Sequence, residues 1–204
     1  MTLKEAYTTG ARGLASRSMT GLARTRVTPN MLTAAGVSLC AAGAVLVYFE
    51  HRGELLFFWL GALAFVVGSV LDILDGALAR AGGKGTQFGA FLDSTLDRVG
   101  EGLILGAIAL VFMRDGDELA LALATAAIGG SFLVPYARAK AEGLGIRGDV
   151  GIGSRAERVV VITVGLVLAP WGVLPWAIGV LALMAWVTVL QRILHVRRHL
   201  REAS

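Results

Sequence analysis

The sequence has little charge for its length, and it contains one cysteine and four prolines. Only 17% of its 204 residues are charged and 55% are hydrophobic, whereas soluble domains average ~25% charged residues. One water-facing domain of this size cannot hide so much apolar surface, which excludes a disordered scaffold and argues against an ordinary cytosolic enzyme. Cys40 has no second cysteine to pair with. We therefore expect neither an intrachain disulfide nor a thiolate metal cluster.

Long apolar segments make up most of the chain, whose mean hydropathy is +0.69. About 20 apolar residues span a bilayer as a helix, and short polar breaks separate the segments. The sequence therefore predicts an all-α integral membrane protein with six transmembrane helices, in Met31–Glu50, Leu55–Ala79, Phe88–Met113, Leu119–Ala137, Val159–Trp171 and Val173–Leu194. The fifth helix is expected to begin nearer Arg155, because its apolar core is short.

The first 27 residues alternate apolar and basic side chains without a continuous apolar core. This pattern is typical of an amphipathic helix that lies in the membrane interface and not of a cleavable signal peptide. A frayed polar tail is the alternative. We expect one membrane domain over residues 1–204, with the interfacial helix in 1–27 and a six-helix bundle in 28–200.

The basic residues are distributed unevenly between the two sides that six spans would create. Sixteen lysines and arginines fall on the side of both termini, and two, Arg52 and Arg114, fall on the other. By the positive-inside rule, both termini face the cytoplasm, in the cytoplasmic (inner) membrane. The net charge of +4 then matches anionic lipid headgroups. We expect the lipid bilayer as a partner and no nucleic acid.

Four carboxylates occur where apolar residues would be expected. Asp72 and Asp75 are near the end of the second predicted span, and Asp93 and Asp97 are near the start of the third. Spacings of three and four residues place each pair on one helix face. The short connection 81–87 predicts that the two helices are antiparallel neighbours. All four carboxylates should then converge just below the cytoplasmic surface.

Such a cluster needs cations, because neighbouring carboxylates repel one another. Hard divalent ions prefer oxygen ligands, so the sequence predicts one or two Mg²⁺ or Mn²⁺ ions. The alternatives are a salt-bridged structural cluster or the cation pathway of a transporter. A transporter needs polar residues across the bilayer, but the distant half of the first three spans has no charge, in Leu39–Phe49, Phe57–Val66 and Leu103–Phe112. This favours an enzyme that is open to the cytoplasm.

Residues 72–97 also form a recognisable motif, Asp72-x2-Asp75-Gly76-x2-Ala79-Arg80-x8-Gly89-x3-Asp93-x3-Asp97. At all eight fixed positions it resembles the signature of the CDP-alcohol phosphotransferase family. The six predicted spans, the interfacial helix and the segment Thr28-Pro29-Asn30 extend the resemblance along the chain.

The resemblance implies an activity and the residues that carry it. Members of this family transfer a phosphatidyl group from CDP-diacylglycerol to an alcohol, release CMP, and are usually homodimers. By the family pattern, the metal ligands are Asp72, Asp75, Asp93 and Asp97. Asp97 would also be the catalytic base. CDP-diacylglycerol would be bound by Thr28, Pro29, Asn30, Met31, Asp75, Gly76, Ala79, Arg80, Thr86 and Gly89. For Thr86, a helix N-cap is a compatible alternative.

Basic residues after the fourth apolar segment indicate a phosphorylated acceptor, because the arginine fork suits phosphate oxygens. We expect the acceptor phosphate to be bound by Arg138, Lys140, Arg155, Arg158 and Arg192. The pattern Arg147-Gly148-Asp149-x-Gly151, followed by Arg155-x-Glu157-Arg158, resembles the bacterial phosphatidylinositol phosphate synthases. That resemblance implies inositol 1-phosphate as the acceptor. Arg138 and Lys140 depart from it, because lysine and arginine stand there in the opposite order.

Simpler interpretations of these basic residues stay open. Positive-inside loops would account for the charge, and Arg192 could extend its guanidinium to the interface. Glycerol 3-phosphate, the acceptor of a phosphatidylglycerophosphate synthase, would also require a cluster of cations.

Overall fold

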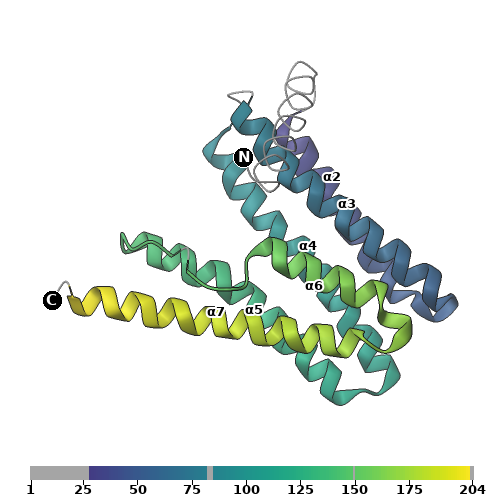
Figure 1. Ribbon diagram of the computed structural model, residues 1–204. Coiled ribbons are helices and arrows are strands. Elements are labelled where there is room, and N and C mark those ends of the chain that lie inside the picture. Colours follow the sequence, from purple (N-terminus) through teal and green to yellow (C-terminus); the bar gives the residue numbers. More distant parts are fainter. Residues whose placement is uncertain (1–27, 82–84, 149, 203–204) are drawn as a thin grey trace, which may run out of the picture.

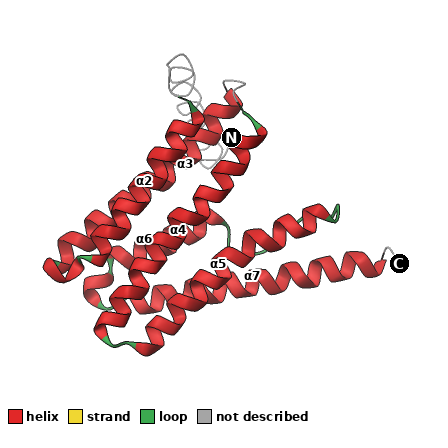
Figure 2. Cartoon of the chain, turned by 180° about the vertical axis from the view of Figure 1, so that it is seen from behind, coloured by secondary structure: helices red, strands yellow, loops and turns green. Residues whose placement is uncertain are grey.

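The computed structural model describes residues 28–81, 85–148 and 150–202, and the predicted interfacial helix over 1–27 lies outside them. The described part of the chain contains helices and connecting turns but no strand (Figures 1 and 2). Two 3-10 helices, η1 (Glu50–Arg52) and η2 (Ala169–Trp171), lie in turns. The α-helices are α2 (Pro29–Tyr48), α3 (Glu54–Ala81), α4 (Gln87–Asp115), α5 (Glu118–Gly143), α6 (Arg155–Val167) and α7 (Leu174–Glu202).

Polar N-caps define where several helices begin. Thr28 accepts a hydrogen bond from the backbone N–H of Met31 at 3.3 Å, just before a proline at the first helical position. Thr86 accepts from the N–H of Gly89 at 2.9 Å, which confirms the N-cap that was the alternative role for this residue. Ser154 and Glu157 form a reciprocal capping box at α6. These contacts satisfy N–H groups that have no partner within the helix.

Each of the six predicted apolar segments contains a helix, although the ends differ. The fourth does not end at Ala137: α5 continues to Gly143, with Pro135 inside the helix. The fifth begins at Arg155, as expected, and ends at Val167, because a 3-10 turn that contains a proline follows.

Among the described residues, four helices are long and apolar enough to cross a membrane, namely α2, α3, α5 and α7. Helix α4 has 29 residues, but Asp93, Asp97, Arg98 and Glu101 interrupt its first half. Helix α6 has 13 residues, which extend about 20 Å, against the ~30 Å of a bilayer core. The chain is therefore a helical, multi-pass membrane protein in which four spans meet both criteria.

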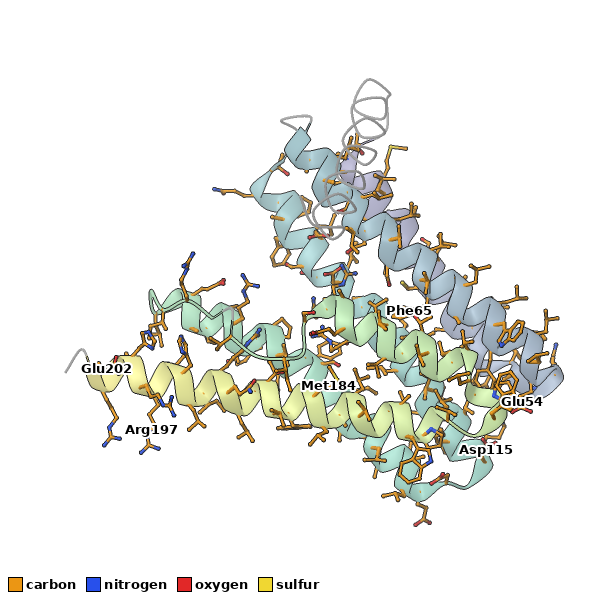
Figure 3. All side chains as sticks on the ribbon, in the orientation of Figure 1. Glu54, Phe65, Asp115, Met184, Arg197 and Glu202 are labelled. Carbon is orange, nitrogen blue, oxygen red and sulfur yellow. The ribbon has the colours of Figure 1, made fainter. Side chains whose placement is uncertain are left out.

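The helices form two groups with α6 between them (Figures 1 and 2). Helix α2 packs against α3 and α4, and α5 packs against α7, while α6 contacts both α3 and α7. Alternate turns meet at one end of the molecule, because Arg114 of α4 pairs with Glu50 and donates to the carbonyl of Tyr48 at 3.0 Å. Figure 3 shows Glu54 and Asp115 at this end, far from the C-terminal end of α7.

The predicted antiparallel packing of α3 against α4 is wrong over most of their length. The two helices have few close approaches, and both pack mainly against α2. Helix α2 comes very close to α3: a Cβ atom at Gly36 would lie 2.8 Å from the carbonyl oxygen of Gly68. Such close contact requires glycine on the facing surfaces. The acidic residues of α3 and α4 therefore face one another across a site that α2 closes on one side.

Candidate metal and substrate site

Three carboxylates from two helices meet near the connection between α3 and α4. Asp72, Asp75 and Asp93 each offer an oxygen, and these oxygens lie within 4.8 Å of one another. Asp72 and Asp75 are buried, with exposed fractions of 8% and 2%. Buried carboxylates need compensating positive charge. Because all the donors are hard oxygens at close range, this group, which we call the acidic cluster, fits Mg²⁺ or Mn²⁺.

A threonine from α2 completes the surroundings of Asp75. The hydroxyl of Thr33 is hydrogen-bonded to the Asp75 carboxylate, and it lies 3.1 Å from the carbonyl oxygen of Pro29. Thr33 is 3% exposed. Thr33 was not among the residues expected from the sequence to bind metal or substrate. The available signal was its place one turn after Pro29, in a segment already expected to bind substrate.

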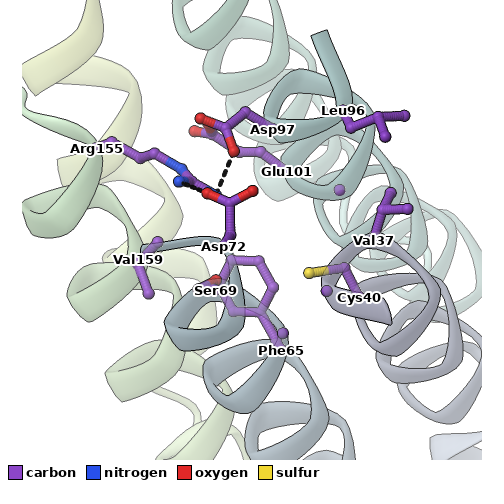
Figure 4. Close-up of a pocket in the computed structure, with 13 residues that line it drawn as sticks. Val37, Cys40, Phe65, Ser69, Asp72, Leu96, Asp97, Glu101, Arg155 and Val159 are labelled. Carbon is purple, nitrogen blue, oxygen red and sulfur yellow. Dashed lines mark hydrogen bonds and ion pairs between the residues drawn. The ribbon is translucent and has the colours of Figure 1, made fainter. Parts of the chain in front are cut away.

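Asp97 lies one turn beyond Asp93 on α4, and it is not among the three carboxylates of the acidic cluster. Its carboxylate lies 2.6 Å from one Nη atom of Arg155 and 3.3 Å from a guanidinium nitrogen of Arg98. Arg155 also forms an ion pair with Asp72 (Figure 4). A single guanidinium thus connects the predicted base to the acidic cluster.

A cavity of about 240 Å³ lies beside the acidic cluster. It gathers seven of the residues expected to bind CDP-diacylglycerol, together with Thr33, Gly85, Ala90 and Asp93; the seven are Pro29, Asn30, Asp75, Gly76, Ala79, Thr86 and Gly89. Thr28 caps α2, and Met31 is 58% exposed. The side chain of Arg80 lies outside the described part of the structure.

Arg158 is buried, with 2% of its surface exposed. It donates two hydrogen bonds to Glu101, at 2.7 and 2.9 Å, and a third to the carbonyl oxygen of Gly153 at 2.9 Å. This bidentate pair ties α6 to α4 and uses all three guanidinium nitrogens of Arg158. Sequence reasoning missed Glu101, although Asp93, Asp97 and Glu101 form a series with a spacing of four.

The other three predicted phosphate ligands lie elsewhere. Arg192 donates to the carbonyl oxygens of Val150, at 2.9 Å, and Val134. Arg138 is exposed and pairs with Glu142 at 2.8 Å, and Lys140 lies 5.6 Å from the ring centre of Tyr136.

The structure therefore does not gather the five basic residues into one cluster, and only Arg155 contacts a predicted metal ligand. Arg158 and Arg192 lie apart from the acidic cluster and bind other groups, because buried guanidinium groups need hydrogen-bond partners. The nearby Glu101 carboxylate and the backbone carbonyls supply those partners.

Acidic residues of two helices, beside a cavity whose lining includes glycines, give this membrane protein a site that fits a divalent metal ion. The model of the CDP-alcohol phosphatidyltransferase family matches residues 26–193. The chain belongs to this family, which confirms the resemblance noted in the motif around Asp72 and Asp97, and it is accordingly a transferase.

Individual relatives carry more specific names. The chain is 38% identical to the phosphatidylinositol phosphate synthase of Mycolicibacterium smegmatis over 182 residues, which cover 85% of this chain and 79% of the relative. It is 34% identical to the archaetidylinositol phosphate synthase of Pyrococcus horikoshii, with 88% of each chain covered.

Solved structures show the same architecture. A crystal structure of the phosphatidylinositol phosphate synthase of Mycobacterium tuberculosis with CDP-DAG bound is similar, with a TM-score of 0.79, 29% identity, and coverage of 89% of this chain and 92% of that one. A second structure of that enzyme, in complex with manganese and citrate, has a TM-score of 0.78, 30% identity, and coverage of 89% and 88%.

Proposed function

We propose that this protein transfers the phosphatidyl group of CDP-diacylglycerol to inositol 1-phosphate and releases CMP. The observation that carries the proposal is the gathering of the family motif around one cavity, with Asp75, Gly76, Gly89 and Asp93 in its lining. The names of the relatives indicate the acceptor. The phosphatidyl and archaetidyl enzymes differ in the lipid part of their names and share the inositol phosphate part.

In this proposal Asp72, Asp75 and Asp93 hold a divalent ion, Mg²⁺ or Mn²⁺, and Asp97 contributes to a second one. The manganese complex of the mycobacterial relative supports the choice of metal. The bound ion would neutralise charge on the pyrophosphate as CMP leaves. Thr33 would hold the Asp75 carboxylate in place through its hydrogen bond.

CDP-diacylglycerol would occupy the cavity next to the acidic cluster. Glycines 76 and 89 leave room for the nucleotide and its phosphates close to the backbone, and both line the cavity. Pro29 and Asn30, at the start of α2, form the opposite wall. Thr28, Met31, Ala79, Arg80 and Thr86 belong to the same proposed subsite.

Asp97 and Arg155 would act together on the acceptor. Arg155 would bind the acceptor phosphate, and because its side chain is within reach of Asp97, the acceptor hydroxyl would be held near the base. Asp97 takes the hydroxyl proton while the acceptor oxygen bonds to phosphorus. The bond from phosphorus to the CMP oxygen breaks, and CMP leaves with its electron pair.

The membrane arrangement is part of the proposal. We infer six spans, with α4 and α6 added to the four that satisfy length and composition. Both termini and the site then face the cytoplasm, because the basic residues gather on that side. We further infer a homodimer in the cytoplasmic membrane, as is usual in the family.

The test is CMP release by the purified protein from CDP-diacylglycerol with Mn²⁺ or Mg²⁺ and three acceptors: inositol 1-phosphate, free inositol and glycerol 3-phosphate. We expect turnover with inositol 1-phosphate and little with free inositol, which offers no phosphate to Arg155. The Asp75→Asn variant serves as the inactive control.

Equal turnover with free inositol would contradict phosphate recognition. Turnover with glycerol 3-phosphate alone would identify the chain as a phosphatidylglycerophosphate synthase instead.

A further inference from the structure

Two cations would compete for the Asp72 carboxylate: the proposed metal ion and the guanidinium of Arg155. Its carboxylate belongs to the acidic cluster, and it also forms an ion pair with Arg155. The same guanidinium contacts Asp97 at 2.6 Å (Figure 4). Arg155 is thus a cation of the chain itself that neutralises two of the four predicted metal ligands.

The backbone that carries Arg155 is fixed on both sides. Before it, Ser154 donates its N–H to Glu157 at 2.7 Å and closes the capping box. After it, Arg158 is held by Glu101 and by the carbonyl oxygen of Gly153. Any displacement of the Arg155 guanidinium must therefore come from its side chain.

The Arg155 side chain has room to move, since 29% of its surface is exposed, against 2% for Arg158. A divalent ion bound by Asp72 would repel the guanidinium at short range and share its carboxylate. A phosphate offers the guanidinium an alternative partner of matching geometry, with two parallel hydrogen bonds. The metal therefore disfavours the ion pair of the guanidinium with Asp72, and the phosphate offers the guanidinium another partner.

We propose that Arg155 competes with the metal for Asp72, and that the acceptor phosphate draws its guanidinium away. Metal and acceptor then bind cooperatively, because each favours the same position of one side chain. The displacement also exposes Asp97 to the acceptor hydroxyl. This inference rests on the proposed function, and it adds a coupling to the site: the metal and the acceptor phosphate both favour the position of Arg155 in which Asp97 is accessible.

The test is the affinity for Mn²⁺ without substrate, measured from the electron paramagnetic resonance signal of free Mn²⁺ in detergent solution. Arg155→Gln removes the competing cation, and we expect it to tighten Mn²⁺ binding at least about tenfold. Arg155→Lys keeps the charge but lacks the fork, so its affinity should fall between those of the two proteins.

The matched control is Arg114→Gln, at the opposite end of the molecule. Arg114 also pairs with a carboxylate, that of Glu50, and its side chain is 31% exposed. This variant should bind Mn²⁺ like the wild type. Thermal unfolding shows whether either variant has lost stability. A loss of stability would weaken Mn²⁺ binding, so it could not produce the tighter binding expected for Arg155→Gln.

Inositol 1-phosphate provides the second arm. Inositol 1-phosphate should tighten Mn²⁺ binding to the wild type. By reciprocal linkage, Mn²⁺ should tighten the binding of inositol 1-phosphate by the same factor. The coupling should disappear in Arg155→Gln. Unchanged or weaker Mn²⁺ binding by Arg155→Gln overturns the competition. If the wild type binds no Mn²⁺, or if the Asp75→Asn variant binds Mn²⁺ with the wild-type affinity, the proposed metal site itself is contradicted. The two failures are therefore distinguishable.

Discussion

At the scale of single residues, the position of Asp75 depends on a hydroxyl from another helix. Thr33 of α2 is hydrogen-bonded to its carboxylate, and both side chains are buried. Partners of this kind orient a metal ligand and tune its basicity. Thr33 has nearly the same shape as valine, so its hydroxyl can be removed with little change in packing volume.

We predict that Thr33→Val lowers the affinity for Mn²⁺ about tenfold, the lower end of what such partners contribute. The measurement is the Mn²⁺ binding isotherm of the purified protein. Thr125→Val is the control, because that hydroxyl bonds the carbonyl of Leu121 in its own helix at 2.9 Å. Equal affinities for the two variants would mean that Thr33 does not support the metal site.

Asp97 forms ion pairs with two guanidinium groups, those of Arg155 and Arg98. We predict that Asp97→Asn lowers turnover at least ~100-fold, as loss of a general base does, while CDP-diacylglycerol binding is largely retained. Single-turnover CMP release and a separate nucleotide-binding assay measure the two effects. Asp115→Asn, an exposed acid at the other end, should change neither. Loss of nucleotide binding in Asp97→Asn would make Asp97 chiefly a ligand.

Residue spacing and the short connection between the two helices predicted that all four aspartates converge, and the carboxylate oxygens of Asp72, Asp75 and Asp93 lie together. Residue spacing could not separate Arg155 from Arg158, which are three residues apart on one face. Their environments differ because Glu101, 57 residues away from Arg158 in the chain, is its partner. Such a pairing depends on how α4 and α6 pack, and local periodicity carries no information about it.

At the scale of helices, glycines determine how closely α2 approaches α3. A Cβ atom at Gly68 would lie 2.6 Å from the carbonyl oxygen of Gly36, and one at Gly43 would lie 2.9 Å from that of Gly61. Backbone atoms cannot yield as the end of a flexible side chain can. The close approach brings Thr33 of α2 to Asp75 of α3.

We therefore predict that Gly36→Ala destabilises the protein by ~1–3 kcal/mol, the range for inserting a methyl group into a filled contact. Its thermal unfolding midpoint in detergent should fall. Gly106→Ala is the control, since no heavy atom lies within 4 Å of the added carbon. A drop of the same size in both variants would point to a general helix effect instead of the α2–α3 contact.

The helices themselves were predictable, and their neighbours were not. Apolar runs located the six α-helices of the described residues, because membrane helices need long apolar stretches. The short connection between α3 and α4 in the sequence predicted that they pack together, but a short connection constrains only the helix ends. The glycines of α2 decide the packing instead, and their role requires knowing which surfaces face each other.

At the scale of the whole molecule, alternate turns lie at opposite ends, and this yields a test of orientation. The sequence contains one cysteine, Cys40, so each cysteine introduced into a Cys40→Ala background can be labelled singly. Asp115→Cys should react with a membrane-impermeant maleimide in intact cells, because its turn is expected to face outward. Lys140→Cys should react only after permeabilisation. The reverse pattern would invert the topology, and labelling of both in intact cells would contradict the alternation of the turns.

The short helix α6 has a further consequence for the surrounding lipid. As one of the six inferred spans, its ~20 Å length falls short of the ~30 Å hydrocarbon thickness, and this hydrophobic mismatch is relieved when the bilayer thins beside it. Arg155 stands at the first position of this helix. A thinned bilayer would bring lipid phosphates deeper than usual along that flank, to the level of the site. Access of the lipid substrate to the site should therefore depend on the thickness of the membrane.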